Sequence, residues 1–165
     1  IKLLEDSESI VEDYLTGREF SVAILKDSDT LDYFIMPLEL IAPADKHGDR
    51  ILSQSVKEDD TESHRPVTNK LLKAKISRLA YDVFIALGAR DYGRIDIRLD
   101  EYGEPQFLEA NLIPSIIDGF GNFPKACLIN EGISHKEAML RIIDLAMRRD
   151  NNMQPSEPAV PAISI

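Results

Sequence analysis

The sequence predicts an α+β fold in which helices pack on an antiparallel sheet. Two observations favour it. Segments rich in β-branched and aromatic residues come in pairs separated by turn residues, and other segments space their hydrophobic residues three and four apart, as helices do. The 165 residues suffice for one domain with a hydrophobic core but are few for a complete multidomain enzyme. We therefore expect one folded region, residues 1–149, and a separate tail.

The first third of the chain reads as an antiparallel meander. Strands are expected at 10–15, 19–25 and 31–41, with turn residues between them. The following stretch, 42–65, is polar and uneven, so we expect loops around one short strand near 51–57.

Helical spacing begins after Pro66. The amphipathic helix expected there ends at Gly88, and its hydrophobic positions are Leu72, Ile76, Leu79, Ala80, Val83, Phe84 and Leu87. Two closing helices are expected at 123–130 and 135–149. Residues 150–165 contain three prolines and little periodicity, which predicts a flexible tail.

Composition excludes several classes of protein. A formal net charge of -10 argues against sequence-independent binding of nucleic acid. No apolar run is long enough to span a membrane, and residues 1–9 lack the features of a signal peptide, so we expect the cytoplasm. Cys127 is the only cysteine, which rules out an internal disulfide and a cysteine-based zinc site within one chain.

The segments 93–99 and 106–112 predict a β-hairpin. If Tyr102 and Gly103 form a two-residue turn, the numbers of facing residues sum to 205. Asp96 then faces Glu109, and Arg94 faces Asn111. Because side chains alternate along a strand, one face carries Arg94, Asp96, Arg98, Phe107, Glu109 and Asn111, and the other carries Ile95, Ile97, Leu99, Leu108, Ala110 and Leu112.

Two facing carboxylates repel each other unless a cation lies between them. Mg²⁺ prefers oxygen ligands, which Asp96, Glu109 and the amide oxygen of Asn111 would supply. In the alternative interpretation, Arg94 and Arg98 neutralise the acids on a solvated hairpin face. The spacing alone does not separate these two interpretations.

The motif GRIDI at 93–97, followed by FLEAN at 107–111 and Pro114, resembles the carboxy-terminal signature of the ATP-grasp superfamily, in its D-alanyl-D-alanine ligase-like branch. The resemblance covers about residues 8–149. It implies an ATP-grasp C-terminal subdomain in which Arg94 stabilises an oxyanion while Asp96, Glu109 and Asn111 hold two magnesium ions.

A second part of the resemblance lies upstream. VEDYL at 11–15 and GRE at 17–19 look like the strand of the family that binds adenine and the glutamate that binds ribose. Lys57 occupies the place of a lysine in a loop that closes over the phosphates, although a solvated loop lysine fits equally well. The ATP contacts implied in this way are Glu12, Asp13, Tyr14, Leu15, Glu19, Lys57 and Leu108.

Two positions depart from the family pattern. Ser115 stands where a glycine usually supplies a backbone NH to the oxyanion hole, and the NH itself is retained. Phe120 stands where a serine usually binds the carboxylate of the second D-alanine. D-alanine is therefore doubtful as the acceptor, and a larger or less polar amine would suit Phe120, which could also be a core residue.

The resemblance implies an ATP-dependent ligase that joins a small-molecule carboxylate to an amine through an acyl phosphate, releasing ADP and phosphate. The alternative is a catalytically impaired nucleotide-binding or scaffolding module of the same fold. The N-terminal ATP-grasp subdomains that precede the hinge in the family are missing here, and Ile1 at the start of the chain favours a fragment. We expect neither nucleic acid nor membrane as a partner, and a homodimer is left open.

Overall fold

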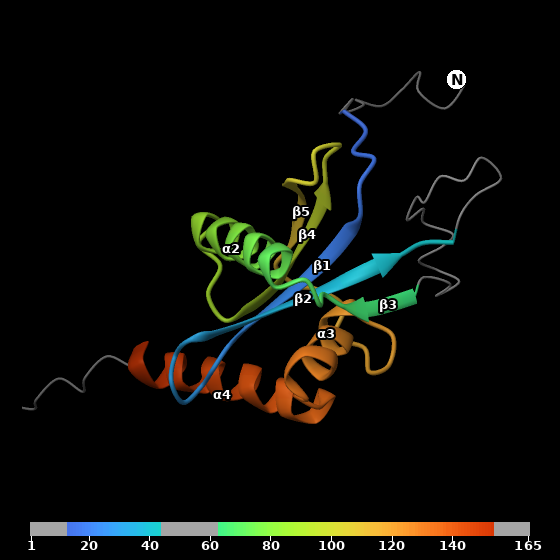
Figure 1. Ribbon diagram of the computed structural model, residues 1–165. Coiled ribbons are helices and arrows are strands. Elements are labelled where there is room, and N and C mark those ends of the chain that lie inside the picture. Colours follow the sequence, from blue (N-terminus) through green and yellow to red (C-terminus); the bar gives the residue numbers. More distant parts are fainter. Residues whose placement is uncertain (1–12, 44–62, 154–165) are drawn as a thin grey trace, which may run out of the picture.

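The computed structural model describes residues 13–43 and 63–153 and has the predicted α+β architecture. Five strands form one antiparallel sheet in the order β3-β2-β1-β4-β5. Helix α2 lies on one side of the sheet, and α3 and α4 lie on the other (Figure 1). The elements are β1 Glu19–Lys26, β2 Tyr33–Ile41, β3 Ser63–Pro66, α2 Lys70–Ala86, β4 Tyr92–Leu99, β5 Pro105–Asn111, α3 Asn122–Glu131 and α4 His135–Met153.

The predicted elements are mostly confirmed within these residues. α2 is the amphipathic helix, and the chain after it turns at Gly88, whose φ of 68° is left-handed. α4 continues to Met153, so the predicted tail began too early. The prediction of a strand is wrong for 13–15, and β3 was not predicted. The strand expected at 51–57 and the rest of the tail lie outside the described residues.

The central strand β1 is buried on both faces, and its alternation divides the core into two layers. Phe20, Val22 and Ile24 pack with residues of α2, including Phe84. Ala23 and Leu25 face the other way and pack with residues of α3 and α4. On this second face the two residues nearest the start of β1, Glu19 and Ser21, are polar. One half of that face is therefore core, and the other half carries polar side chains.

The hairpin between β4 and β5 differs from the prediction at its tip. The last facing pair is Leu99 with Pro105, and the turn contains five residues, 100–104, instead of two. The side chain of Asp100 accepts hydrogen bonds from the backbone NH groups of Tyr102 and Glu104, both at 2.9 Å, which fixes the longer turn.

A β-bulge next to Asp96 compensates for the longer turn. Ile97 faces Phe107 and Asp96 faces Glu109, so Leu108 is an extra residue in β5. The predicted facing of Asp96 with Glu109 is thus confirmed. The predicted face of Phe107 is wrong, because its partner Ile97 is buried beneath α2.

Within residues 13–43 and 63–153, no helix is both long enough and apolar enough to cross a membrane. Cys127 is buried, and burial raises the pKa of its thiol to about 12, so it is an inert core residue.

An ion cluster around the buried Glu39 of β2 joins Arg18, just before β1, to Arg65 of β3. The carboxylate of Glu39 is 3% exposed and accepts two hydrogen bonds from Arg18, both at 2.6 Å, and two from Arg65, at 2.7 and 3.0 Å. Burial raises the pKa of Glu39, but the hydrogen bonds and charges of the two arginines outweigh burial and lower the pKa to about 2. This cluster fixes the short edge strand β3 to β2.

The lowered pKa predicts a stability contribution that depends on pH. It is fully present above the ordinary pKa of 4.5 and is lost as the pH falls from there through about 2. At pH 7, Glu39→Gln should lower the free energy of unfolding by roughly 3 kcal/mol. Urea unfolding at a series of pH values should show the gap between wild type and variant closing below pH 4.5.

Asp82→Asn is the matched control, because it breaks the exposed pair between Arg78 and Asp82 on α2. This change should leave the free energy of unfolding nearly unaltered at every pH. A gap between wild type and Glu39→Gln that stays constant down to pH 2 would contradict the assignment.

Candidate nucleotide and metal site

Three rows of facing residues cross β1, β4 and β5 on the polar half of the sheet face described above. Glu19 faces Arg98, and Ser21 faces Asp96, which in turn faces Glu109. In the third row, Arg94 faces Asn111. The predicted ribose-binding residue, Glu19, and the predicted metal ligands therefore lie on one face of the sheet. The row of Glu19 and the row of Asp96 are two residues apart along β1 and β4.

Arg94 and Asp96 form the centre of the metal-ligand candidates. Arg94 donates two hydrogen bonds to Asp96, at 2.9 and 2.7 Å, and approaches Glu109 at 3.4 Å. Asp96 also accepts a hydrogen bond of 2.8 Å from the hydroxyl of Ser21. The side-chain amide of Asn111 donates to Glu109 at 3.0 Å. These contacts hold the two carboxylates against each other.

The electrostatics of the pair favour an added cation. Asp96 is 6% exposed, and burial raises the pKa of its carboxyl; Glu109 acts in the same direction, whereas Arg94 and Ser21 lower the pKa. Two carboxylates and an amide oxygen match the ligands that Mg²⁺ prefers. In the described part of the chain, no three His, Cys, Asp or Glu side chains come together as a metal site, and the third predicted ligand, Asn111, is an amide.

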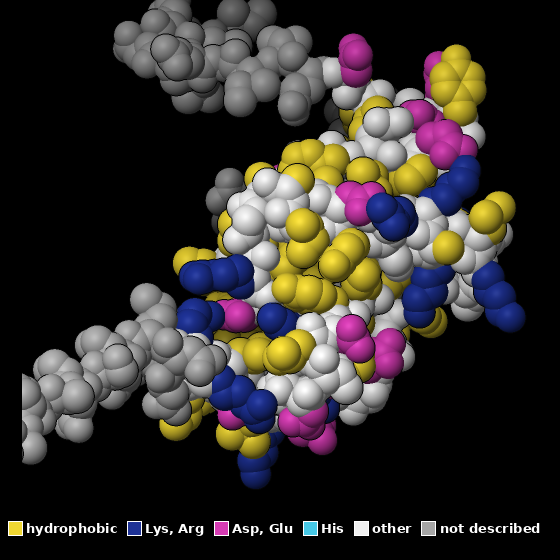
Figure 2. Space-filling view, turned by 90° about the vertical axis from the view of Figure 1, so that its left-hand side faces the viewer, with side chains coloured by type: hydrophobic (Ala, Val, Ile, Leu, Met, Phe, Trp, Pro, Cys, Tyr) yellow, Lys and Arg dark blue, Asp and Glu magenta, His cyan; other side chains and the backbone are white. Residues whose placement is uncertain are grey.

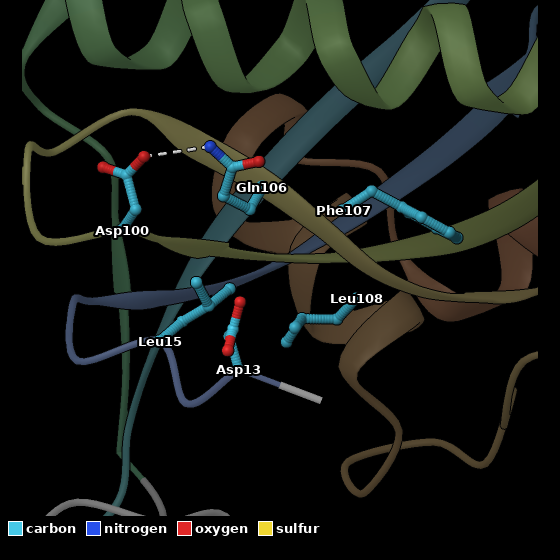
Figure 3. Close-up of a pocket in the computed structure, with 6 residues that line it drawn as sticks. All are labelled: Asp13, Leu15, Asp100, Gln106, Phe107 and Leu108. Atoms are coloured by element: carbon cyan, nitrogen blue, oxygen red, sulfur yellow. Dashed lines mark hydrogen bonds between the residues drawn. The ribbon is translucent and has the colours of Figure 1, made fainter. Parts of the chain in front are cut away.

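A cavity of about 390 Å³ opens beside these rows, between the segment 13–15 and the start of β5. Three of the predicted ATP contacts, Asp13, Leu15 and Leu108, lie around it (Figure 3). Asp100, Gln106 and Phe107 complete the lining, and the side-chain amide of Gln106 donates to Asp100 at 3.0 Å. Polar and nonpolar side chains together line this cavity, as they do in small-molecule sites of proteins.

Tyr14 and Glu19 do not line this cavity. Both contact Arg98: the guanidinium lies 5.2 Å from the centre of the Tyr14 ring and donates to the Glu19 carboxylate at 3.3 Å. Glu19 is nevertheless adjacent to the cavity wall along the chain, because the segment 13–18 leads directly into β1.

Four predicted residues remain, namely Ser115, Phe120, Glu12 and Lys57. Ser115 and Phe120 are exposed and lie in the loop between β5 and α3, which begins directly after Asn111. Neither lines the cavity beside 13–15. Glu12 and Lys57 lie outside the described residues.

Sequence reasoning missed the role of Ser21 and of the bulge at Leu108. A signal for Ser21 exists, since it is the one hydroxyl in the otherwise nonpolar run 20–25, where it needs a partner. The bulge has no such signal, because it depends on the length of a turn that two different geometries can form.

Comparisons with known proteins agree on one family. A family model described as "D-ala D-ala ligase C-terminus" matches residues 2–144. The D-alanine--D-alanine ligase of Hydrogenovibrio crunogenus is 29% identical over 143 residues, covering 86% of this chain and 42% of that protein. The enzyme of the same name from Burkholderia thailandensis is 32% identical over 136 residues, covering 79% of this chain and 39% of that protein.

The fold is also that of a solved ligase. The crystal structure of D-alanine--D-alanine ligase from Bacillus anthracis complexed with ATP has a TM-score of 0.63 at 19% identity, covering 85% of this chain and 42% of that one. The chain thus spans about two fifths of the length of the relatives it matches.

The repulsion between Asp96 and Glu109 predicts opposite effects of one substitution with and without metal. Without divalent cations, Glu109→Gln should not lower the melting temperature, because it removes a like charge beside Asp96. With Mg²⁺ at roughly ten times its dissociation constant, wild type should gain about 1.4 kcal/mol of stability and the variant much less. Thermal melts at increasing MgCl₂ concentration measure both effects.

Glu104→Gln serves as the control on the same hairpin. Glu104 is about as exposed as Glu109, 53% against 56%, but pairs with Lys75 at the tip of the hairpin. This variant should respond to Mg²⁺ as wild type does. Equal responses of wild type and Glu109→Gln would contradict a metal role for Glu109.

Proposed function

Since the chain belongs to the family of D-alanyl-D-alanine ligase C-terminal domains, we propose that it supplies the ATP-binding and magnesium-binding half of an ATP-dependent carboxylate–amine ligase. The observation that carries the proposal is the continuous polar face of β1, β4 and β5. On it, the cluster of Arg94, Asp96 and Glu109 lies beside a cavity lined by Asp13, Leu15 and Leu108. A nucleotide in the cavity would reach the cluster along this face.

The proposed reaction has two steps. A carboxylate oxygen of the first substrate attacks the γ-phosphorus of ATP, which forms an acyl phosphate and ADP. The amine nitrogen of the second substrate then attacks the acyl carbon and loses a proton, and inorganic phosphate leaves. The carbonyl oxygen carries negative charge between the attack and the departure of phosphate.

The predicted site residues take separate roles in this scheme. Asp96, Glu109 and Asn111 would hold two magnesium ions, which supply charge neutralisation on the phosphates. Arg94, already held in place by two hydrogen bonds to Asp96, would stabilise the oxyanion together with the backbone NH of Ser115. Asp13 and Leu15 would contact the adenine ring with Leu108, and Glu19 would accept from the ribose hydroxyls.

The loop after Asn111 favours a nonpolar acceptor. Five of its large hydrophobic side chains are exposed, namely Leu112, Ile113, Ile116, Ile117 and Phe120. If this loop borders the acceptor site, an amine with a hydrophobic side chain would bury that surface more favourably than D-alanine would.

We propose that further subdomains of the same protein complete the site. The chain spans 42% and 39% of two ligase relatives. One face of the molecule shows hydrophobic side chains gathered near its centre, with charged side chains around them (Figure 2). Exposed nonpolar surface of this kind is typical of a face that another part of a protein covers.

The intact protein should release ADP and phosphate when it is given Mg²⁺, ATP, a carboxylic acid and an amine. Asp96→Asn should lower kcat by at least roughly a hundredfold, because it weakens both metal binding and the placement of Arg94. A coupled ADP assay and phosphate detection measure the two products, and circular dichroism checks that the variant is folded.

Asp91→Asn is the matched control, because Asp91 also pairs with an arginine, Arg149, but does so at the opposite end of β4 from the cavity. It should leave kcat unchanged. Release of AMP and pyrophosphate would contradict the reaction class. Magnesium-dependent nucleotide binding without turnover would identify the protein as a catalytically impaired module.

A further inference from the structure

Arg98 on β4 is an enclosed arginine whose contacts converge on the segment before β1. Its side chain is 12% exposed. Its Nε donates to the backbone carbonyl of Gly17 at 3.1 Å, one terminal nitrogen donates to Glu19 at 3.3 Å, and the other donates to the hydroxyl of Tyr14 at 3.3 Å. The guanidinium also lies 5.2 Å from the centre of the Tyr14 ring.

The segment that Arg98 contacts has little regular structure to hold it. Residues 13–18 belong to no strand, although Asp13 and Leu15 line the cavity. Backbone hydrogen bonds between this segment and β4 occur only near its end, from Gly17 to Leu99 at 3.1 Å and from Leu99 to Arg18 at 2.9 Å. A side chain at Gly17 would place its Cβ 2.4 Å from the carbonyl oxygen of Leu99, so the close approach requires glycine.

We propose that Arg98 is a positioning residue for nucleotide binding, one that fixes the cavity wall and the ribose-binding carboxylate in a single arrangement. The inference rests on the proposed function. Through Tyr14, Arg98 holds the chain between Asp13 and Leu15, and through Glu19 it orients a carboxylate at the start of β1. A wall held in its binding conformation does not have to be ordered when the nucleotide binds, which raises affinity.

The contacts made at position 98 require the geometry of an arginine side chain. A guanidinium donates in several fixed directions within one plane and also stacks on an aromatic ring, whereas an ammonium group is a compact point charge. Lysine at this position could keep the charge near Glu19 but not the simultaneous bonds to Gly17 and Tyr14. Arg98→Lys should therefore restore only part of what Arg98→Met loses.

Hydrogen–deuterium exchange without nucleotide tests the positioning directly. Arg98→Met should speed amide exchange across residues 13–18, and exchange in α2 and α4 should stay as in wild type. Calorimetry with MgATP on the same proteins should show roughly tenfold weaker binding in Arg98→Met and an intermediate value in Arg98→Lys. The preference for ATP over 2′-deoxy-ATP should also fall, because Glu19 loses the hydrogen bond from Arg98 that orients its carboxylate.

Arg141→Met is a closely matched control. Arg141 also pairs with a carboxylate, Asp27, at 3.2 Å and also lies over an aromatic ring, that of Phe34, at 5.4 Å. It is on α4, away from the cavity. This variant should leave both the exchange of residues 13–18 and the nucleotide preference as in wild type.

The outcomes separate the inference from the proposed function. Unchanged exchange at residues 13–18 in Arg98→Met, or faster exchange throughout the sheet, would overturn the role of Arg98. Nucleotide binding that weakens equally in Arg98→Met and Arg141→Met would also overturn it. If wild type binds no MgATP while Arg98→Met still loosens residues 13–18 alone, the proposed function is refuted and the anchoring by Arg98 is supported.

Discussion

The facing of Asp96 and Glu109 across β4 and β5 is the constraint on which the candidate site depends. Two facing carboxylates are unfavourable in a sheet, and here burial raises the pKa of Asp96 although Arg94 donates to it and also contacts Glu109. Ser21 from β1 adds a buried hydrogen bond to Asp96, so three strands contribute to one charged cluster. The same face becomes nonpolar toward α3 and α4, where Ala23 and Leu25 join the core.

The division of that face explains why the candidate nucleotide-binding residues lie next to the candidate metal-binding residues. The alternation of β1 places Glu19 and Ser21 on the same side as Ala23 and Leu25, and the second pair packs in the core with residues of α3 and α4. Arg98 and Asp96 face Glu19 and Ser21 in turn. The polar half of one sheet face therefore runs without interruption from the segment 13–18 to Asn111.

Much of this arrangement could be predicted from residue patterns, and the exceptions have physical causes. Runs of β-branched and aromatic residues predicted β1 and β2, alternating residues predicted β4 and β5, and the spacing of nonpolar residues predicted α2, because these patterns reflect burial on one or two faces. β3 is four residues long and exposes most of its side chains, so no such pattern marks it. The facing of Asp96 with Glu109 was predicted correctly although the turn was not, since the five-residue turn and the extra residue Leu108 compensate for each other. Arg98 was predicted only as a charge that neutralises acids on a solvated hairpin face. Its contacts were missed because they join residues about 80 positions apart in the sequence.

The bulge at Leu108 allows one strand, β5, to contribute to both the cavity and the carboxylate pair. In a regular strand, neighbouring residues point to opposite faces, so only alternate residues can serve a given site. Here consecutive residues serve adjoining places, with Leu108 on the cavity and Glu109 opposite Asp96. Deleting Leu108 would leave Glu109 next to Phe107 in the ladder and still opposite Asp96, while removing one wall of the cavity. The cavity wall and the carboxylate pair are thus set by different residues of β5, so a change at Leu108 alters the first without changing which residue faces Asp96.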